Sequence, residues 1–156
     1  MSEQNKVIAR RSFEELFTHG KLDVADEIFA KEYVGHDPNM PREIRGPDEF
    51  KQFARMYRTA FPDLKLVVEE QVAEGDLVVT RFTATGTHRG ELMGIAPTGA
   101  KVTVTGISID RMKNGKSVES WTHYDALNMF RQLGAIPSPQ LGAPPAQAER
   151  PQPRRS

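Results

Sequence analysis

The residues best suited to chemistry gather in one short stretch late in the chain, the heptapeptide ESWTHYD from Glu119 to Asp125. Trp121, His123 and Asp125 occupy every second position of this stretch. Side chains two positions apart on a β-strand project from the same face. A strand here would therefore point an indole, an imidazole and a carboxylate into one space, and we predict that these three residues line a functional cavity.

Asp125 is the predicted proton-transfer group. A carboxylate at the deep end of a cavity, beside Trp121, loses water, and this loss disfavours its charged form and makes it a better acid/base at neutral pH. We expect His123 to be neutral, and to hold substrate or polarise a developing enolate oxygen. Two structural alternatives stay open: Asp125 caps a short helix beginning at Ala126, and His123 is a half-exposed residue of a strand edge.

Two further histidines are candidates for substrate binding. His36 stands at the junction of an extended segment and a loop. His88 is the last residue of an alternating run, and it falls on the same face as the apolar residues of that run. Aromatic residues of the predicted helices complete the expected substrate-binding wall, namely Phe17, Phe53 and Tyr57. Asp37 and Asp110 have neighbouring turns that explain them, and we assign them no chemistry.

A metal site is the sharper alternative for the same residues. His123 and Asp125 form the His-x-Asp half of a facial triad, to which His88 or His36 would add a third ligand. Only the residue types support this interpretation, and the usual distal histidine after the pair is absent, so we predict no metal. The sequence also lacks cysteine, which excludes disulfides and thiolate chemistry.

Composition limits the classes of partner. The chain has 156 residues, the usual size of one domain, and its 21 Lys and Arg balance 21 Asp and Glu. A zero net charge gives no electrostatic reason to expect nucleic acid or an anionic membrane surface as a partner. The N-terminal stretch lacks the apolar run of a secretory signal, and no segment approaches transmembrane length, so we expect a cytoplasmic protein.

The elements that must position these residues follow from hydrophobic periodicity. Apolar residues recur at helical spacing from Asn5 to Phe17, and again from Leu22 until Tyr33-Val34-Gly35 breaks the pattern. His36 to Gly46 is rich in turn formers and predicts a loop. A third helix opens at Pro47 and ends before Pro62.

After Pro62 the period changes from helical to two. Four runs predict strands, Leu64 to Val72, Leu77 to His88, Lys101 to Met112 and Ser117 to Asp125. Two compact turns are predicted to form hairpins. Glu74-Gly75-Asp76 links the first two strands, and Lys113 to Lys116, which holds an Asn-Gly pair, links the last two. Helices followed by a strongly bent antiparallel sheet are typical of an α+β fold in which the helices cover one sheet face. The Pro-rich segment 137–156 predicts a disordered tail.

The sequence resembles a known family in several ordered phrases. These are YVGHDP, FPDL, RFTATGTHRGELMGIAPTGAKVTVTGISIDRMKNGKSVESW and DALNMFRQLG, and with the three predicted helices they resemble the SnoaL-like polyketide cyclases, also called ester cyclases, over residues 1–136. The resemblance implies the cone-shaped α+β barrel of the nuclear transport factor 2-like superfamily. It also implies that Asp125 is the general acid/base of a cofactor-free aldol closure, with His36 and His88 at the cavity or its mouth.

We therefore predict a cofactor-independent, polyketide cyclase-like enzyme that performs aldol-type or isomerase-type chemistry on a small apolar carbonyl compound. Family habit suggests a homodimer. This fold also hosts non-catalytic binding or dimerisation modules, hydrolases and dehydratases, and these stay open as alternatives.

Overall fold

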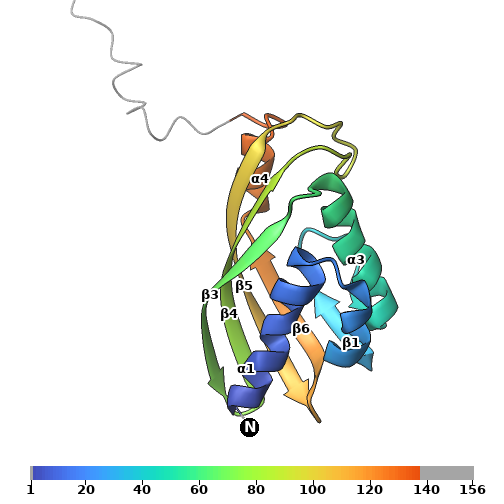
Figure 1. Cartoon of the computed structure of the whole chain (residues 1–156), viewed down its shortest axis with the longest axis vertical. Helices are drawn as coiled ribbons and strands as arrows, with labels where there is room; N and C mark the ends of the chain where they lie inside the picture. The colour runs from blue at the N-terminus through green and yellow to red at the C-terminus, as the bar shows by residue number, and fades with distance from the viewer. Residues whose placement is uncertain (1, 138–156) are drawn as a thin grey trace, which may run out of the picture.

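Helices come first along the chain and most of the strands follow (Figure 1). The computed structural model describes residues 2–137, so the predicted tail, apart from its first residue, lies outside the described residues. The elements in chain order are α1 (Ser2–Arg11), the π-helix η1 (Ser12–Thr18), the 3-10 helix η2 (Leu22–Val24), α2 (Ala25–Ile28), β1 (Phe29–His36), β2 (Ile44–Arg45), α3 (Gly46–Ala60), β3 (Lys65–Glu74), β4 (Leu77–Thr87), β5 (Lys101–Lys113), β6 (Lys116–Tyr124) and α4 (Ala126–Gln132).

The strands form one six-stranded, curved sheet in the order β2-β1-β6-β5-β4-β3 (Figure 1). Neighbouring strands are antiparallel except for β1 and β6, which run parallel. The tight turn between β5 and β6 is the predicted Asn-Gly hairpin, since Asn114 and Gly115 both have positive φ, 52° and 76°. The predicted α+β class, with helices on one face of a bent and mostly antiparallel sheet, is confirmed.

One element differs from its prediction. The helical pattern that begins at Leu22 ends after Ile28, and residues Phe29–His36 form strand β1 instead of continuing the helix into a loop. Pairing explains the change, because Val34, Gly35 and His36 pair with β6, and tertiary partners override local periodicity. The predicted loop after His36 likewise includes the short strand β2, which pairs with β1.

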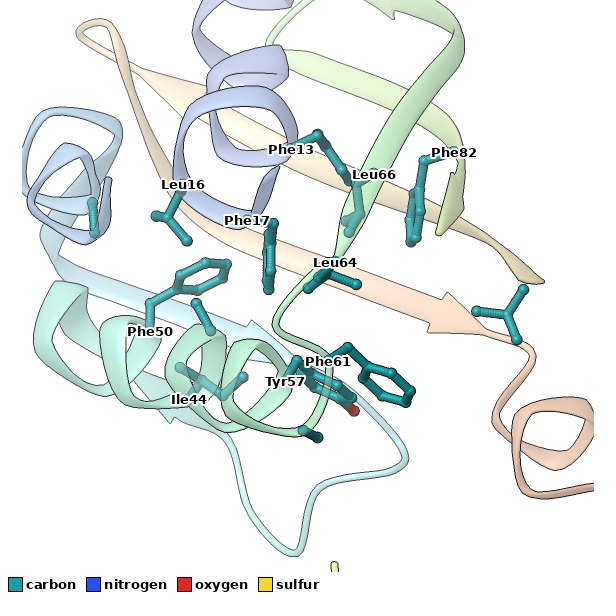
Figure 2. Close-up of a cluster of buried hydrophobic side chains, with 14 of the residues drawn as sticks. Phe13, Leu16, Phe17, Ile44, Phe50, Tyr57, Phe61, Leu64, Leu66 and Phe82 are labelled. Carbon is teal, nitrogen blue, oxygen red and sulfur yellow. The ribbon is translucent and has the colours of Figure 1, made fainter. Parts of the chain in front are cut away.

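The helices cover one face of the sheet. The continuous rod of α1 and η1 contacts β3 and β4, and α3 lies against β1. Helix α3 carries Pro47 and two acidic residues in its first turn, where both residue types are favoured, and closes with a bond from the Phe61 N–H to the Tyr57 carbonyl (2.8 Å). Figure 2 shows the aromatic side chains of η1 and α3 in the space between helices and sheet, together with Leu66 of β3 and Phe82 of β4.

Within residues 2–137, no helix is long and apolar enough to cross a lipid bilayer.

Candidate active site

A cavity of about 100 Å³ lies between the helices and the sheet. Most of its wall is apolar and aromatic, and is formed by Phe13, Phe17, Phe29, Phe50, Phe53, Leu64, Leu66, Phe82, Ala84 and Val104. A polar strip crosses this wall, and consists of Ser12, Tyr33, Asp37, Tyr57, Ser108, Asp110, Ser120, Thr122 and Tyr124. Phe17, Phe53 and Tyr57 thus lie on the cavity wall where the sequence places them, and their role in binding stays a prediction.

The hydroxyl groups of the polar strip are paired with one another, except that of Ser12, which donates to the Ala9 carbonyl (2.9 Å). Tyr57 bonds to Tyr124 (2.6 Å), and Ser108 bonds to Thr122 (2.8 Å). Tyr33 bonds in the same way to Ser120 on the neighbouring strand. Burial raises the pKa of each of these three tyrosines, that of Tyr124 to about 12, so all three stay neutral near pH 7. The strip is therefore an uncharged and largely satisfied surface, with two carboxyl groups set into it.

Asp37 is the carboxyl group with free bonding capacity. Its side chain is only 8% exposed, its Oδ1 accepts the Asn39 N–H (2.8 Å), and its Oδ2 is buried without a partner among the described residues. Burial raises the pKa of Asp37, while hydrogen bonding from Asn39 and the electrostatic influence of His123 oppose the rise. A buried carboxylate oxygen without a donor costs about 1–3 kcal/mol or more, so this atom is placed to receive a proton or a ligand.

Asp110 is the second carboxyl group of the strip. It is 6% exposed, and its Oδ1 accepts a hydrogen bond from Ser117 (2.8 Å). Burial raises the pKa of Asp110 to about 6, and the bond from Ser117 only partly opposes this rise. Neither acid was assigned chemistry from the sequence, although the strict alternation of buried residues along β5 includes Asp110.

A second, outer pocket of about 330 Å³ adjoins this region and shares Asp37 with the cavity. Its wall is formed by His36, Asp37, Pro38, Met40, Arg42, Glu43 and His123. Two of the predicted histidines, His36 and His123, therefore lie in the outer pocket and not in the inner cavity. Asp37 belongs to both walls, so a ligand in either compartment can contact it.

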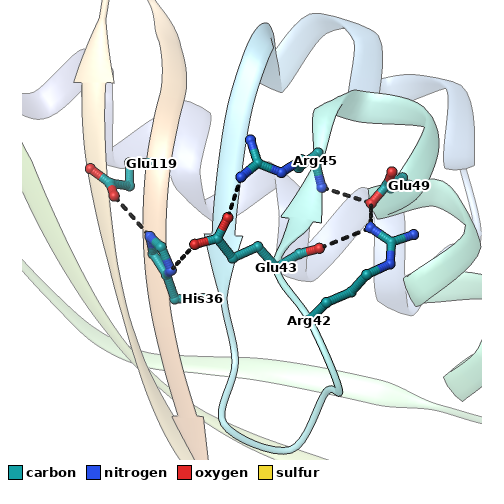
Figure 3. Close-up of polar contacts among 6 residues, drawn as sticks. All are labelled: His36, Arg42, Glu43, Arg45, Glu49 and Glu119. Carbon is teal, nitrogen blue, oxygen red and sulfur yellow. Dashed lines mark hydrogen bonds and ion pairs between the residues drawn. The ribbon is translucent and has the colours of Figure 1, made fainter.

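His36 is tied into the surface by two carboxylates. Figure 3 shows its ring between Glu119 and Glu43, with Nε2 2.8 Å from a Glu119 oxygen and Nδ1 3.7 Å from a Glu43 oxygen. The same ring stacks on Trp121, with the ring centroids 5.6 Å apart. These contacts join the end of β1 to β6 and to the loop before β2, so His36 shapes the outer pocket.

Trp121, His123 and Asp125 do not enter the cavity, and this corrects their predicted placement. The inward residues at this end of β6 are Ser120 and Thr122, with Tyr124 beyond them, whereas Trp121 is half-buried and His123 exposed on the opposite face. The cause is an irregularity opposite Arg111 and Met112, where the register of β6 jumps from Glu119 to Ser117. The extra residue reverses the alternation, because a β-bulge re-aims the side chains that follow it.

Asp125 caps a helix, which is the structural alternative considered for it. It is exposed, it is the N-cap of α4, and its side chain accepts the Asn128 N–H (3.1 Å). The prediction that Asp125 is buried at the deep end of the cavity is therefore wrong, and the loss of water on which its acid/base role rests is not found.

His88 is buried away from both pockets. It is 0% exposed, its Nδ1 accepts the Thr98 N–H (3.2 Å), and its ring lies 5.6 Å from that of Phe61. Backbone bonds with Gly99 and Ala100 add to these contacts, so His88 holds together the base of the long β4–β5 connection. The residues proposed for a facial metal site are not brought together, and the described part of the chain has no group of three His, Cys, Asp or Glu able to hold a metal ion.

Comparison with known proteins gives consistent matches over most of the chain. The family model for SnoaL-like polyketide cyclase matches residues 7–133. The chain is 30% identical over 130 residues to aklanonic acid methyl ester cyclase DauD of Streptomyces sp. (strain C5), covering 80% of this chain and 78% of DauD.

Solved structures agree with this match. IdmH from Streptomyces antibioticus, provisionally described as a polyketide cyclase, has a TM-score of 0.74 and 32% identity, and the match covers 84% of this chain and 99% of IdmH. AclR from Streptomyces galilaeus, provisionally described as a hydroxylase, has a TM-score of 0.81 and 27% identity, and the match covers 96% of this chain and 92% of AclR.

Proposed function

The chain belongs to the SnoaL-like polyketide cyclase family, as its resemblance indicated, and from this premise we propose that it closes a ring in a polyketide-type carbonyl compound by cofactor-independent proton transfer at Asp37. The observation that carries the proposal is the free Oδ2 of Asp37, buried in the wall that the cavity and the outer pocket share. A carboxylate so placed can act as a general base on a substrate that occupies either compartment.

The two compartments suggest how the substrate is divided. Ligand pockets usually enclose about 300–1,000 Å³, and the inner cavity of about 100 Å³ is smaller than this range, whereas the outer pocket reaches about 330 Å³. We propose that the reacting carbonyl part enters the aromatic cavity while the remainder of the compound occupies the outer pocket, beside His36 and His123. Asp37 then faces the carbon that must be deprotonated.

The reaction would be an intramolecular aldol closure without net gain or loss of protons. The Asp37 carboxylate takes a proton from the carbon next to a carbonyl group, and the electron pair of that C–H bond forms an enolate. The enolate carbon attacks a second carbonyl carbon of the same molecule, and the oxygen of that carbonyl receives the proton back from Asp37. His123 lowers the pKa of Asp37 electrostatically, and we propose that it supports the base in this way and not as the neutral group expected from the sequence.

Two competing assignments remain as alternatives. The resemblance assigns proton transfer to Asp125, which lies at the start of α4, and residue spacing adds His123, which lies on the outer face of β6. A non-catalytic binding module would use the same aromatic cavity without turnover, and the hydroxylase description of AclR shows that provisional functions of similar proteins vary. Both alternatives make predictions about Asp37 that differ from ours.

The first test uses aklanonic acid methyl ester, the compound named for the relative DauD. Purified protein is incubated with it in the presence of chelator and without added cofactor, and products are separated by liquid chromatography. We expect a cyclised product, and a loss of about 10²–10⁴ in rate for Asp37→Asn, the usual contribution of a general base. Equal turnover by the parent and Asp37→Asn overturns the proposed mechanism, and binding without conversion supports the binding module.

We further propose a homodimer that works in the cytoplasm without nucleic acid. Ile107 on the outer face of β5 is 49% exposed, and the neighbouring strand β6 carries the half-buried Trp121. These apolar side chains support contact with a second copy at this face. The location rests on the sequence alone. Light scattering would contradict the dimer if the mass in solution stayed at 17.5 kDa, and fractionation of the native host tests the location.

A further inference from the structure

We propose that Asp110 is a second catalytic residue, whose protonated carboxyl group donates a hydrogen bond to the carbonyl oxygen of a substrate in the inner cavity. The inference rests on the proposed function, and it adds the group that stabilises the enolate while Asp37 removes the proton.

The position of Asp110 allows direct contact with a ligand. It lies on β5, where every second residue from Val102 to Met112 is buried, so its side chain points to the cavity side. The side chain lines the cavity and is 6% exposed. A substrate that fills the aromatic space therefore meets this carboxyl group.

The surroundings of Asp110 favour a hydrogen-bond donor over an anion. Ser117 donates to Oδ1 (2.8 Å), while the hydroxyl of Ser120 is already bonded to Tyr33. None of the described residues that line the cavity is a lysine or an arginine, so no cation compensates an ionised Asp110. Because a carboxylic acid both donates and accepts, the protonated form can accept from Ser117 with one oxygen and donate from the other.

The pairing of the strands keeps the two acids apart. Asp110 pairs with Ser120 on β6, Ser120 pairs with Gly35 on β1, and Asp37 follows Gly35 by two residues. The acids thus stand two strand spacings apart, roughly 9.5 Å, and one two-residue step along, roughly 7 Å. At this separation they do not contact each other, and a molecule in the cavity that both acids line can meet one acid at an oxygen and the other at a carbon.

Asp110 acts on the enolate that forms when Asp37 removes the proton. As the Asp37 carboxylate takes the α-proton, the electron pair moves into a carbon–carbon double bond and negative charge develops on the carbonyl oxygen. A preformed donor aimed at that oxygen stabilises this charge more than the neutral ketone, and so lowers the barrier. Asp110 keeps its proton throughout.

Protonation of Asp110 makes binding pH-dependent. The titratable groups that line the cavity with it are Tyr33, Tyr57, Tyr124 and Asp37. Burial holds the pKa of the tyrosines above the range of interest, and burial raises the pKa of Asp110 to about 6. The donor is therefore present below about pH 6 and is lost above it, so a neutral ketone should bind more weakly as pH rises through this value.

The probe is acetophenone labelled with carbon-13 at its carbonyl carbon, titrated into the protein by NMR across this pH range. For the parent we expect a downfield carbonyl shift on binding below about pH 6, and a Kd that increases toward tenfold per pH unit above it. Asp110→Asn keeps a donor that does not titrate, so its Kd should no longer change with pH. Asp110→Leu should lose the downfield shift.

Asp37→Asn is the matched control, and it should keep the pH dependence of the parent. The inference is overturned if acetophenone does not bind, if the parent shows no downfield shift at low pH, or if Asp110→Asn keeps the pH dependence. These outcomes concern binding, so they are distinct from failure of the proposed function, which appears as unchanged turnover in Asp37→Asn.

Discussion

The two faces of strand β6 differ in what they do with polar residues. The inward residues Ser120, Thr122 and Tyr124 are held in hydrogen bonds with neighbouring strands and with α3, on the wall of a largely apolar cavity. The outward residues Glu119 and Trp121 contact charged or ionisable partners at the surface. Trp121 and His123, whose types suggest a function, lie outward. The burial that changes acid/base behaviour is found on the inward face.

Burial is the physical reason that this difference matters. On the outer face, water and salt weaken the ion pairs of His36 and Arg111, which are about a third or more exposed. On the inner face, Asp37 and Asp110 lose water without gaining a cation. Reactivity at neutral pH therefore belongs to the cavity wall, even though His, Trp and Asp residues are denser in the outer segment.

The largest expected effect of the inner environment is on stability as a function of pH. The raised pKa of Asp110, from 3.8 to about 6, means that the folded protein holds this proton more tightly than the unfolded chain, a difference of about 3 kcal/mol. This stabilisation is fully present below the unfolded pKa of about 3.9 and is lost as pH rises through about 6.

Denaturant unfolding of the parent and Asp110→Asn at both ends of this range measures the effect. Relative to the parent, the unfolding free energy of Asp110→Asn should increase by about 3 kcal/mol as pH rises, because only the parent loses the stabilisation. Glu119→Gln on the outer face is the control, and its difference from the parent should be much smaller. A constant difference for Asp110→Asn would remove the contrast between the faces.

A smaller effect is expected from filling the cavity. Ala84 lines the cavity from β4, while its neighbour Thr85 is exposed on the other face. Ala84→Leu adds three carbons to a space of about 100 Å³ and should weaken acetophenone binding at least about tenfold, or 1.4 kcal/mol. Thr85→Leu should change the Kd by less than about twofold. Equal effects of the two substitutions would place the ligand elsewhere.

The smallest effect is expected on the outer face. His36→Gln removes the pairs with Glu119 and Glu43, each partner being about a third or more exposed. Such pairs contribute about 0–1 kcal/mol, and salt should reduce even this difference. Urea unfolding at low and high ionic strength checks it, and a loss well above about 2 kcal/mol that salt does not change would show that the outer cluster is structural.

The sequence predicts the fold better than it predicts the site. Period-two patterns place β3 to β6 and the Asn114-Gly115 turn correctly, because alternation and turn chemistry are local. Strand β1 is missed since its partner, β6, lies more than 80 residues later. The same patterns contain Asp110 on the buried face of β5, so that acid could have been found.

The inward face of β6 depends on one extra residue near Glu119, and local spacing does not reveal it. Without the bulge, alternation from the buried Ser117 would turn Trp121 and His123 into the cavity. Asp37 follows the end of β1 in a loop, and its burial comes from tertiary packing alone. Local patterns therefore do not reveal which face of the sheet a side chain occupies or how deeply it is buried, and both decide the chemistry.

The most direct test of this account is the turnover of two single variants measured side by side on the same substrate. Asn caps a helix about as well as Asp, so Asp125→Asn should keep α4 intact and change turnover by less than about twofold. Asp37→Asn should reduce turnover at least about a hundredfold with an unchanged unfolding midpoint. The opposite result, an inactive Asp125→Asn and an active Asp37→Asn, would contradict the account and assign the chemistry to the outer face.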